Sequence, residues 1–157
     1  MATRPAPRWL TDDQQAVWRS YIAMVRQLNE ALERQLHEDS EMAMSDYVLL
    51  MRLSEAPHHQ LRMSELATDS VYSRSRLSHA VSRLESWGWV RRMGCDDDRR
   101  GTFAQLTDEG LAMLAAAAPG HATAVHDLMF EPLGDDGAAE FGELVGRILD
   151  RLSQDRV

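Results

Sequence analysis

The residues with the clearest chemical potential lie in one short segment of the chain. Residues 73–83 read Ser-Arg-Ser-Arg-Leu-Ser-His-Ala-Val-Ser-Arg. Serine hydroxyls allow a helix to approach a polymer backbone closely, and arginine reaches phosphates or binds the O6/N7 edge of guanine through two hydrogen bonds. No acidic residue occurs in this segment before Glu85. Because solvated helix faces usually mix both signs of charge, the pattern favours contact with nucleic acid.

The distribution of charge supports this interpretation, although the total charge does not. The 157-residue chain has a formal net charge of −8, which repels phosphate in general. Between Tyr72 and Gln105, however, seven arginines stand against four acidic residues. That segment carries a charge of +3 and the rest of the chain −11. We therefore expect a local basic surface on an acidic protein.

Helices that could position this segment are indicated by caps and apolar periodicity. Thr11 and Gln14 form a capping box ahead of apolar residues spaced three and four apart, which predicts a helix over residues 11–37. Further helices are predicted at residues 45–56, 65–68 and 73–88, and strands at 89–93 and 102–106. The polar, glycine-bounded loop between the two strands predicts a hairpin.

The C-terminal third is again helical in pattern. Thr107 caps a fifth helix, which we expect Pro119 to kink or interrupt because proline lacks the N–H that the helix needs. The helical pattern resumes near His121 and ends around residues 132–134. A last helix begins near Asp136 and carries an apolar stripe as far as Leu152.

These elements predict a mainly α protein with six helices and a small antiparallel wing of two to three strands. Their order is that of a winged helix-turn-helix, with a lobe over residues 45–106 in a single unit of residues 1–157. Two apolar stripes, in residues 11–37 and 107–153, exceed what this lobe can cover: Leu28, Leu32 and Leu36, and Phe141, Leu144, Ile148 and Leu152. We therefore expect dimerisation helices at both termini and a homodimer.

Composition excludes several classes of protein. No apolar run approaches the ~18 residues of a membrane span, and the N-terminus lacks the apolar region of a signal peptide. The single cysteine, Cys95, excludes an internal disulfide framework and fits a reducing compartment. The sequence contains no catalytic triad spacing, phosphate-binding glycine loop or H-E-x-x-H motif. We expect a cytoplasmic protein that is neither an enzyme nor attached to a membrane.

The motif block resembles the MarR family of transcriptional regulators. The resemblance rests on residues 73–77, on Val-Ser-Arg-Leu-Glu at 81–85 with Gly88, on Asp-Arg-Arg-Gly at 98–101 and on Leu-Thr-Asp-Glu-Gly at 106–110. It implies a triangular homodimer in which the terminal helices intertwine and each winged lobe binds one half of a pseudo-palindromic operator in double-stranded DNA. Trp87, Trp89 and Pro119 depart from the commoner pattern.

The DNA-contacting residues follow from the basic segment and from the resemblance. Carried over by position, Arg100 matches the wing arginine that enters the minor groove, and Asp98 matches the carboxylate that orients it. The predicted contacts are Ser73, Arg74, Ser75, Arg76, Ser78, His79, Arg83, Asp98, Arg99, Arg100 and Thr102. Repression by steric blocking is what the family resemblance implies.

A small aromatic or phenolic effector is a further expectation from the resemblance. The candidate pocket residues are Trp18, Tyr21, Tyr47 and Met51, with Arg52 or Arg92 as the partner of an anion. An ordinary helical core explains the same residues equally well.

Two other kinds of regulator and one other class of protein remain open. His37 with Glu41 and His121 with His126 suggest a metal-responsive regulator, but the second pair misses the spacing of four residues, and no metal or other cofactor is predicted. Cys95 suggests a redox-responsive one, but the three aspartates after it disfavour a reactive thiolate. The third alternative is a winged-helix module that binds another protein.

Overall fold

The structure is a computed structural model that describes residues 6–68, 74–94 and 102–154. Its first element is the long helix α1, Asp12–Ser40. The predicted capping box is confirmed: the Gln14 N–H donates to Thr11 Oγ1 at 3.2 Å, and the Thr11 N–H donates to Gln14 Oε1 at 3.0 Å. The helix ends three residues later than predicted, where Glu41 adopts a left-handed conformation and its N–H donates to the carbonyl of His37.

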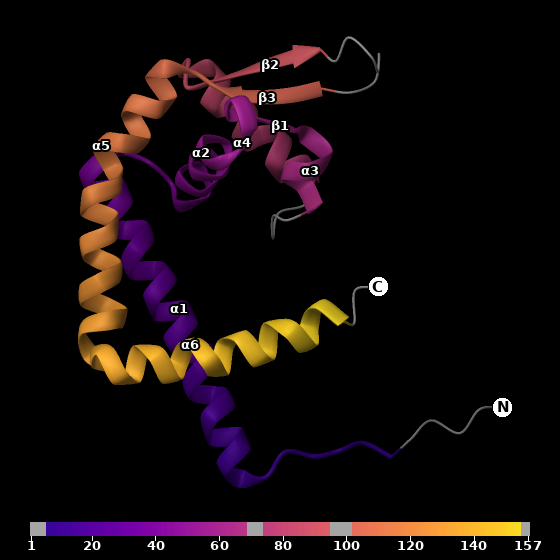
Figure 1. The fold of residues 1–157 in the computed structure, drawn as a ribbon, viewed down its shortest axis with the longest axis vertical. Coiled ribbons are helices and arrows are strands. Elements are labelled where there is room, and N and C mark those ends of the chain that lie inside the picture. The colour runs from indigo at the N-terminus through magenta and orange to yellow at the C-terminus, as the bar shows by residue number, and fades with distance from the viewer. Residues whose placement is uncertain (1–5, 69–73, 95–101, 155–157) are drawn as a thin grey trace, which may run out of the picture.

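The next elements form the predicted lobe, drawn in purple to salmon in Figure 1. In chain order they are α2 (Met44–Glu55), the 3₁₀ turn η1 (Pro57–His59), β1 (Gln60–Arg62), α3 (Met63–Thr68), α4 (Arg74–Ser86), β2 (Val90–Gly94) and β3 (Thr102–Leu106). The strands form one antiparallel sheet in the order β1-β3-β2. The third strand, β1, is shorter than an alternating pattern can reveal, since it has only three residues.

One apolar core holds the lobe together. Leu50, Leu53, Leu66, Leu77 and Leu84 are fully or almost fully buried in it. The core extends beyond the lobe through Leu36 of α1 and through Leu114 and Ala117 of the fifth helix, α5 (Asp108–Val125). The lobe is therefore packed directly on the two long helices.

The predicted interruption at Pro119 is wrong, because α5 runs through it. Proline cannot donate to the carbonyl of Ala115, but both residues are exposed, so water can hydrate that carbonyl. α5 also approaches α1 closely at this level: a Cβ on Gly120 would lie 3.0 Å from Asp39 Oδ2 and 3.2 Å from Gln35 Nε2. Figure 1 shows α5 beside the upper half of α1.

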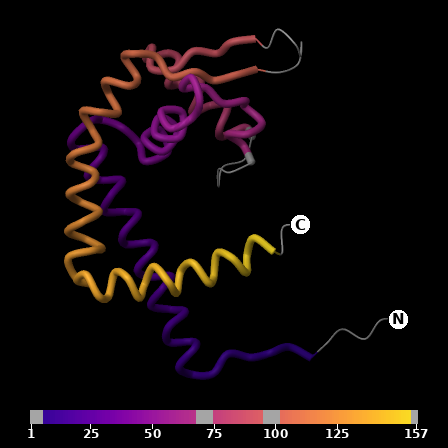
Figure 2. The backbone as a smooth tube through the Cα atoms, in the orientation of Figure 1, coloured from indigo at the N-terminus to yellow at the C-terminus, as the bar shows by residue number. Residues whose placement is uncertain are grey.

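The chain instead changes direction after α5. The π-helical turn η2 (His126–Phe130) leads without a loop into α6 (Glu131–Gln154), and Gly134 has a non-helical backbone with φ 64°. Figure 2 shows the sharp corner between the orange and yellow segments. The protein is thus mainly helical with a three-stranded antiparallel wing, and the prediction of six separate helices holds only in part.

Among residues 6–68, 74–94 and 102–154, no helix combines the length and the apolar character needed to cross a membrane.

Candidate nucleic-acid interface

The helix α4 separates its apolar and polar residues onto opposite sides. Leu77, Ala80, Val81 and Leu84 are buried against the lobe. Four polar residues of the first turns are exposed, and we call them the recognition face: Ser75, Arg76, Ser78 and His79. They combine small hydroxyls with cationic and imidazole donors and contain no acid. This surface can approach a polyanion without charge repulsion.

A second arginine of α4 faces the body of the lobe. Arg83 Nη2 lies 2.6 Å from Asp46 Oδ1, and Arg83 Nε lies 3.2 Å from Asp46 Oδ2. Asp46, in the first turn of α2, is fully buried, whereas the Arg83 side chain is 42% exposed. Contact of Arg83 with DNA stays a prediction, but its guanidinium is already held by a two-point ion pair. The only sequence signal for Asp46 is an acid directly before the apolar run of residues 47–51.

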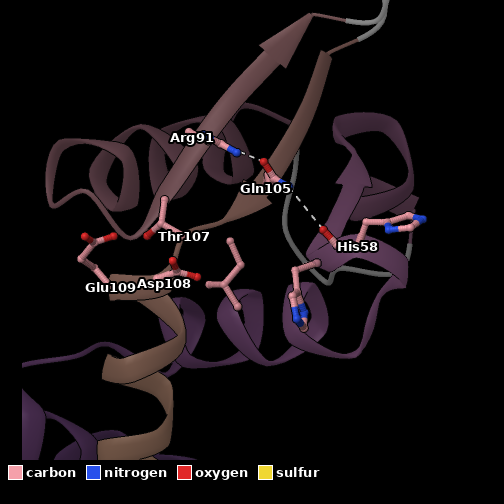
Figure 3. A pocket seen from close by; sticks show the side chains of 8 residues that line it. His58, Arg91, Gln105, Thr107, Asp108 and Glu109 are labelled. Atoms are coloured by element: carbon pink, nitrogen blue, oxygen red, sulfur yellow. Dashed lines mark hydrogen bonds between the residues drawn. The ribbon is translucent and has the colours of Figure 1, made fainter.

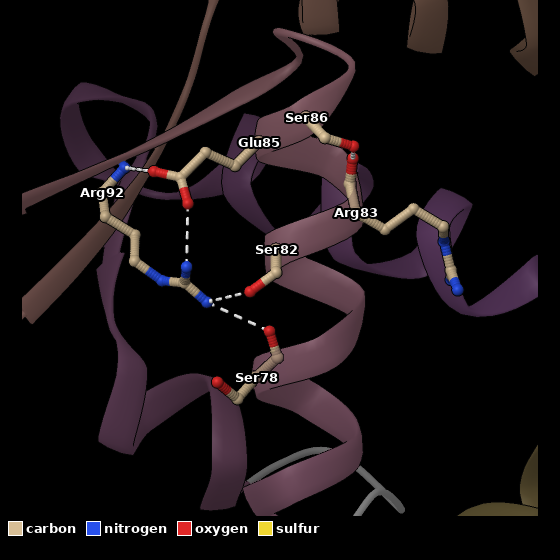
Figure 4. A network of polar contacts seen from close by, with 6 residues as sticks. All are labelled: Ser78, Ser82, Arg83, Glu85, Ser86 and Arg92. Carbon is tan, nitrogen blue, oxygen red and sulfur yellow. Dashed lines mark hydrogen bonds and ion pairs between the residues drawn. The ribbon is translucent and has the colours of Figure 1, made fainter.

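The other side of α4 is tied to the wing by Arg92 of β2 (Figure 4). Arg92 Nη1 donates to Glu85 Oε2 at 2.8 Å, and Nη2 donates to the Ser78 carbonyl and to Ser82 Oγ, both at 3.0 Å. The Arg92 N–H also donates to Glu85 Oε1 at 3.1 Å. We call this set of contacts the wing latch. Arg92 was one of two arginines, with Arg52, predicted as the partner of an effector anion, and the structure shows it bonded to α4.

Several predicted contacts fall at or beyond the limits of the described residues. Ser73, Asp98, Arg99 and Arg100 lie outside the described residues, as does Cys95. The backbone places Arg74 at the start of α4 and Thr102 at the start of β3, next to the wing tip.

The predicted effector residues form two separate pairs within one chain. Trp18 and Tyr21 stack on α1 with ring centroids 5.8 Å apart, and both are exposed. Tyr47 is buried, and Met51, on the same helix, is half-buried. Tyr47 packs near residue 35 of α1, about 25 Å along that helix from Trp18 at 1.5 Å per residue. A single chain does not bring the two pairs together.

The surroundings of Tyr47 define the joint between the lobe and the long helices. Its ring centroid lies 4.4 Å from that of His121, and His121 Nδ1 lies 3.4 Å from Gln35 Oε1. Burial raises the pKa of Tyr47 and lowers the pKa of His121. Both groups are therefore held in their neutral forms near pH 7.

A polar pocket of about 310 Å³ lies where β3 runs into α5 (Figure 3). Arg91 Nε donates to Gln105 Oε1 at 2.7 Å, and Gln105 Nε2 donates to the His58 carbonyl at 3.4 Å. The rest of the lining is His59, Leu106, Thr107, Asp108 and Glu109. None of the predicted effector residues lines it, and its charges are of both signs.

Two of the histidines considered as metal ligands, His121 and His126, contact different neighbours. His121 contacts Tyr47 and Gln35, while His126 Nδ1 lies 3.2 Å from Asp127 Oδ1. Within the part of the chain that the structure describes, no three His, Cys, Asp or Glu side chains are grouped to hold a metal ion.

Comparison with known proteins gives one consistent result. A sequence profile of the MarR family matches residues 42–102. The structure matches that of Streptomyces coelicolor Sco3205, a MarR family transcriptional regulator in complex with DNA, with a TM-score of 0.88 and 47% identity over 95% of this chain and 93% of that one. It also matches AbsC, a MarR family transcriptional regulator of the same organism, with a TM-score of 0.86 and 38% identity over 94% and 99% of the two chains.

A curated relative shows the same likeness at lower identity. The regulator PecS of Dickeya dadantii is 30% identical over 111 residues, which span 71% of this chain and 66% of PecS. The alignment thus covers just under two thirds of that relative's length.

Proposed function

This chain belongs to the MarR family, and we propose that it regulates transcription as a homodimer that binds a pseudo-palindromic operator in double-stranded DNA. The observation that carries the proposal is the recognition face of α4, which is exposed, basic and free of acids beside the wing. The likeness to Sco3205, crystallised with DNA, supports it. Repression by blocking the promoter is the mode we propose.

The contacts divide by the groove that each element would enter. The recognition face suits the major groove, where Arg76 is able to bind guanine through two hydrogen bonds while the serines contact phosphate. Arg99 and Arg100 of the wing would enter the narrow minor groove, with Asp98 orienting Arg100. In this scheme residues 45–106 form the DNA-binding lobe.

A homodimer is supported by apolar surface that one chain leaves uncovered. On α6, Leu144, Ile148, Leu149 and Leu152 are each more than half exposed, at helical spacing. On α1, Leu32 and Leu36 of the predicted stripe are buried within the chain, and the exposed stripe lies in the N-terminal half instead: Val17, Trp18, Tyr21 and Ile22. Patches of this kind mark interfaces. We propose that residues 11–37 and 107–153 pair with the same helices of a second copy, which would set the half-sites about one helical turn, ~34–36 Å, apart.

Titration of labelled duplexes by fluorescence anisotropy tests the proposal. The operator is first enriched from random DNA with the wild-type protein. We expect Arg76→Ala to weaken operator binding at least tenfold and to reduce the slope of log K against log salt by about 1.8, because each of the two subunits loses one cation that displaces about 0.9 counterions from the DNA. Arg8→Ala removes the same charge from an exposed position ahead of α1 and serves as the control. Equal affinities for the wild-type protein and both variants would exclude α4 as the reading element.

We also propose that a small aromatic effector regulates operator binding. The exposed Trp18–Tyr21 stack is a suitable surface for a planar aromatic anion, and in the proposed dimer it would face Tyr47 and Met51 of the second copy. Titration with salicylate, followed by tryptophan fluorescence and by operator release together, tests this. Binding of salicylate with no change in operator affinity would contradict an effector role, since a ligand acts only through its different affinities for two states.

A further inference from the structure

Asp46 is a buried charged residue where α2 packs against α4. It is the one charged residue that is buried among the described residues, with an exposed fraction of 0%. A carboxylate withdrawn from water requires a cation and hydrogen-bond donors. Arg83 supplies both through two nitrogens, at 2.6 and 3.2 Å. The pair therefore joins the interior of α2 to the surface of α4.

The first turn of α2 is also where the lobe meets the long helices. The Met44 N–H donates to Glu33 Oε2 of α1 at 2.9 Å. Tyr47, the residue after Asp46, packs on His121 of α5. The carboxylate that holds α4 thus sits on a turn that α1 and α5 hold in place.

The Arg83 guanidinium also lies beside tryptophan, although 42% of the side chain is exposed. Its Cζ lies 5.7 Å from the Trp87 ring centroid, and the Trp87 and Trp89 centroids lie 4.7 Å apart. A cation over an indole ring is stabilised electrostatically. Arg83 is therefore fixed by a carboxylate and an aromatic ring, which leaves it poorly placed to follow a phosphate.

We infer that Asp46 and Arg83 are positioning residues that set the angle of α4 relative to α1 and α5, so that the recognition face meets the operator in register. The inference rests on the proposed function, and it assigns Arg83 a role other than the direct contact expected from sequence. Figure 4 shows Arg83 and Arg92 extending to opposite sides of α4. The ion pair with Asp46 fixes the helix to the lobe, and the wing latch fixes it to β2.

The geometry shows why a small change would matter. Arg76 lies seven residues from Arg83, which is about 10 Å along the helix at 1.5 Å per residue. A tilt of about 10° at Arg83 would displace Arg76 by nearly 2 Å, several times the ~0.5 Å tolerance of a well-placed binding constellation. In a two-fold dimer the error would occur at both half-sites.

The test compares specific with non-specific binding. Asp46→Asn keeps the shape of the side chain but removes its charge, so the protein becomes more positive while α4 loses its anchor. We expect operator affinity to fall at least tenfold, and affinity for a scrambled duplex to stay the same or to rise. Glu55→Gln removes the same charge from the exposed end of α2 and should leave the ratio of the two affinities unchanged. An unchanged ratio in Asp46→Asn would overturn the inference.

The salt dependence separates positioning from contact. Arg83→Gln should weaken operator binding without changing the salt slope, whereas Arg76→Gln should lower the slope by about 1.8, that is about 0.9 for each subunit. A slope that falls equally in both variants would show that Arg83 contacts phosphate and would refute its positioning role.

A double variant protects the test against misfolding of the single ones. Asp46→Asn with Arg83→Gln leaves neither an unpaired buried carboxylate nor an unpaired guanidinium, and circular dichroism checks its fold. Residues that act as a unit are non-additive, so the double variant should lose no more operator affinity than either single one. Additive losses would contradict the inference. If the wild-type protein enriches no operator, the proposed function is refuted together with the inference. If only Arg76→Gln loses operator affinity, the inference alone is refuted.

Discussion

Replacement of Arg92 by methionine should separate the wing from the recognition helix while leaving both intact. The methionine keeps the apolar stem on β2 but removes the ion pair with Glu85 and the hydrogen bonds to the Ser78 carbonyl and Ser82 Oγ. Glu85 keeps the bond from the backbone N–H of residue 92, so its carboxylate is not left without a donor. The variant therefore tests the wing latch and not the folding of its parts.

The size of the effect follows from the exposure of the partners. The side chains of Arg92 and Glu85 are 28% and 38% exposed, so their ion pair contributes at most about 1 kcal/mol. Each of the two other hydrogen bonds contributes on the order of 0.5–1 kcal/mol. The total is about 2 kcal/mol. If the latch serves to hold the wing and α4 in register for DNA, this free energy corresponds to a loss of affinity of up to about 30-fold for each lobe on its half-site.

The neighbouring arginine provides a matched control. Arg91 projects from the opposite face of β2, where its Nε donates to Gln105 instead of to α4. Arg91→Met removes the same charge one residue away. Anisotropy titrations of both variants on one operator duplex should show a loss for Arg92→Met about tenfold larger than for Arg91→Met. Equal losses would refute the latch and leave only a general effect of charge.

Three further predictions concern the joint, its pH dependence and the dimer. Gly110→Ala should lower the free energy of unfolding by about 3 kcal/mol in a denaturant titration, because the new Cβ would lie 2.1 Å from the Trp89 carbonyl oxygen. Gly142→Ala is the control: its Cβ would have no atom within 4 Å, so the substitution should be neutral or stabilising. Because burial lowers the pKa of His121, the folded chain binds fewer protons than the unfolded chain as the pH falls below about 6.5, so the folded state loses stability in that range. His121→Gln should therefore flatten a plot of Tm against pH below about pH 6.5. Ile148→Glu should give monomers in sedimentation at micromolar concentration, and an unchanged sedimentation coefficient would argue against α6 as an interface.

Local signals in the sequence predicted the elements that depend on local chemistry. Thr11 and Thr107 cap helices as expected, because their hydroxyls accept from backbone N–H groups three residues ahead. Gly88, with φ 79°, ends the α4 segment as expected, since few other residues adopt that backbone conformation. The apolar positions of α4 predicted its buried side for the same reason, as the periodicity of a helix is a local property.

Features set by distant parts of the chain could not be predicted in this way. The strand β1 exists because Leu61 pairs with Ala104, and Pro119 remains in a helix because α1 packs beside α5. The ion pair of Asp46 with Arg83 joins residues 37 positions apart, so neither side chain alone signals it. Arg92 was assigned to an effector by residue type, yet the fold places Glu85 next to it.

Selection of binding sites from random duplex DNA tests the central claim most directly. A two-fold dimer with one recognition face in each lobe should enrich a pseudo-palindrome whose half-sites are centred about one helical turn apart, and Arg76→Ala should relax the preference within each half-site. Enrichment of no sequence, or of one without two-fold symmetry, would contradict the assignment of this chain as a dimeric operator-binding regulator.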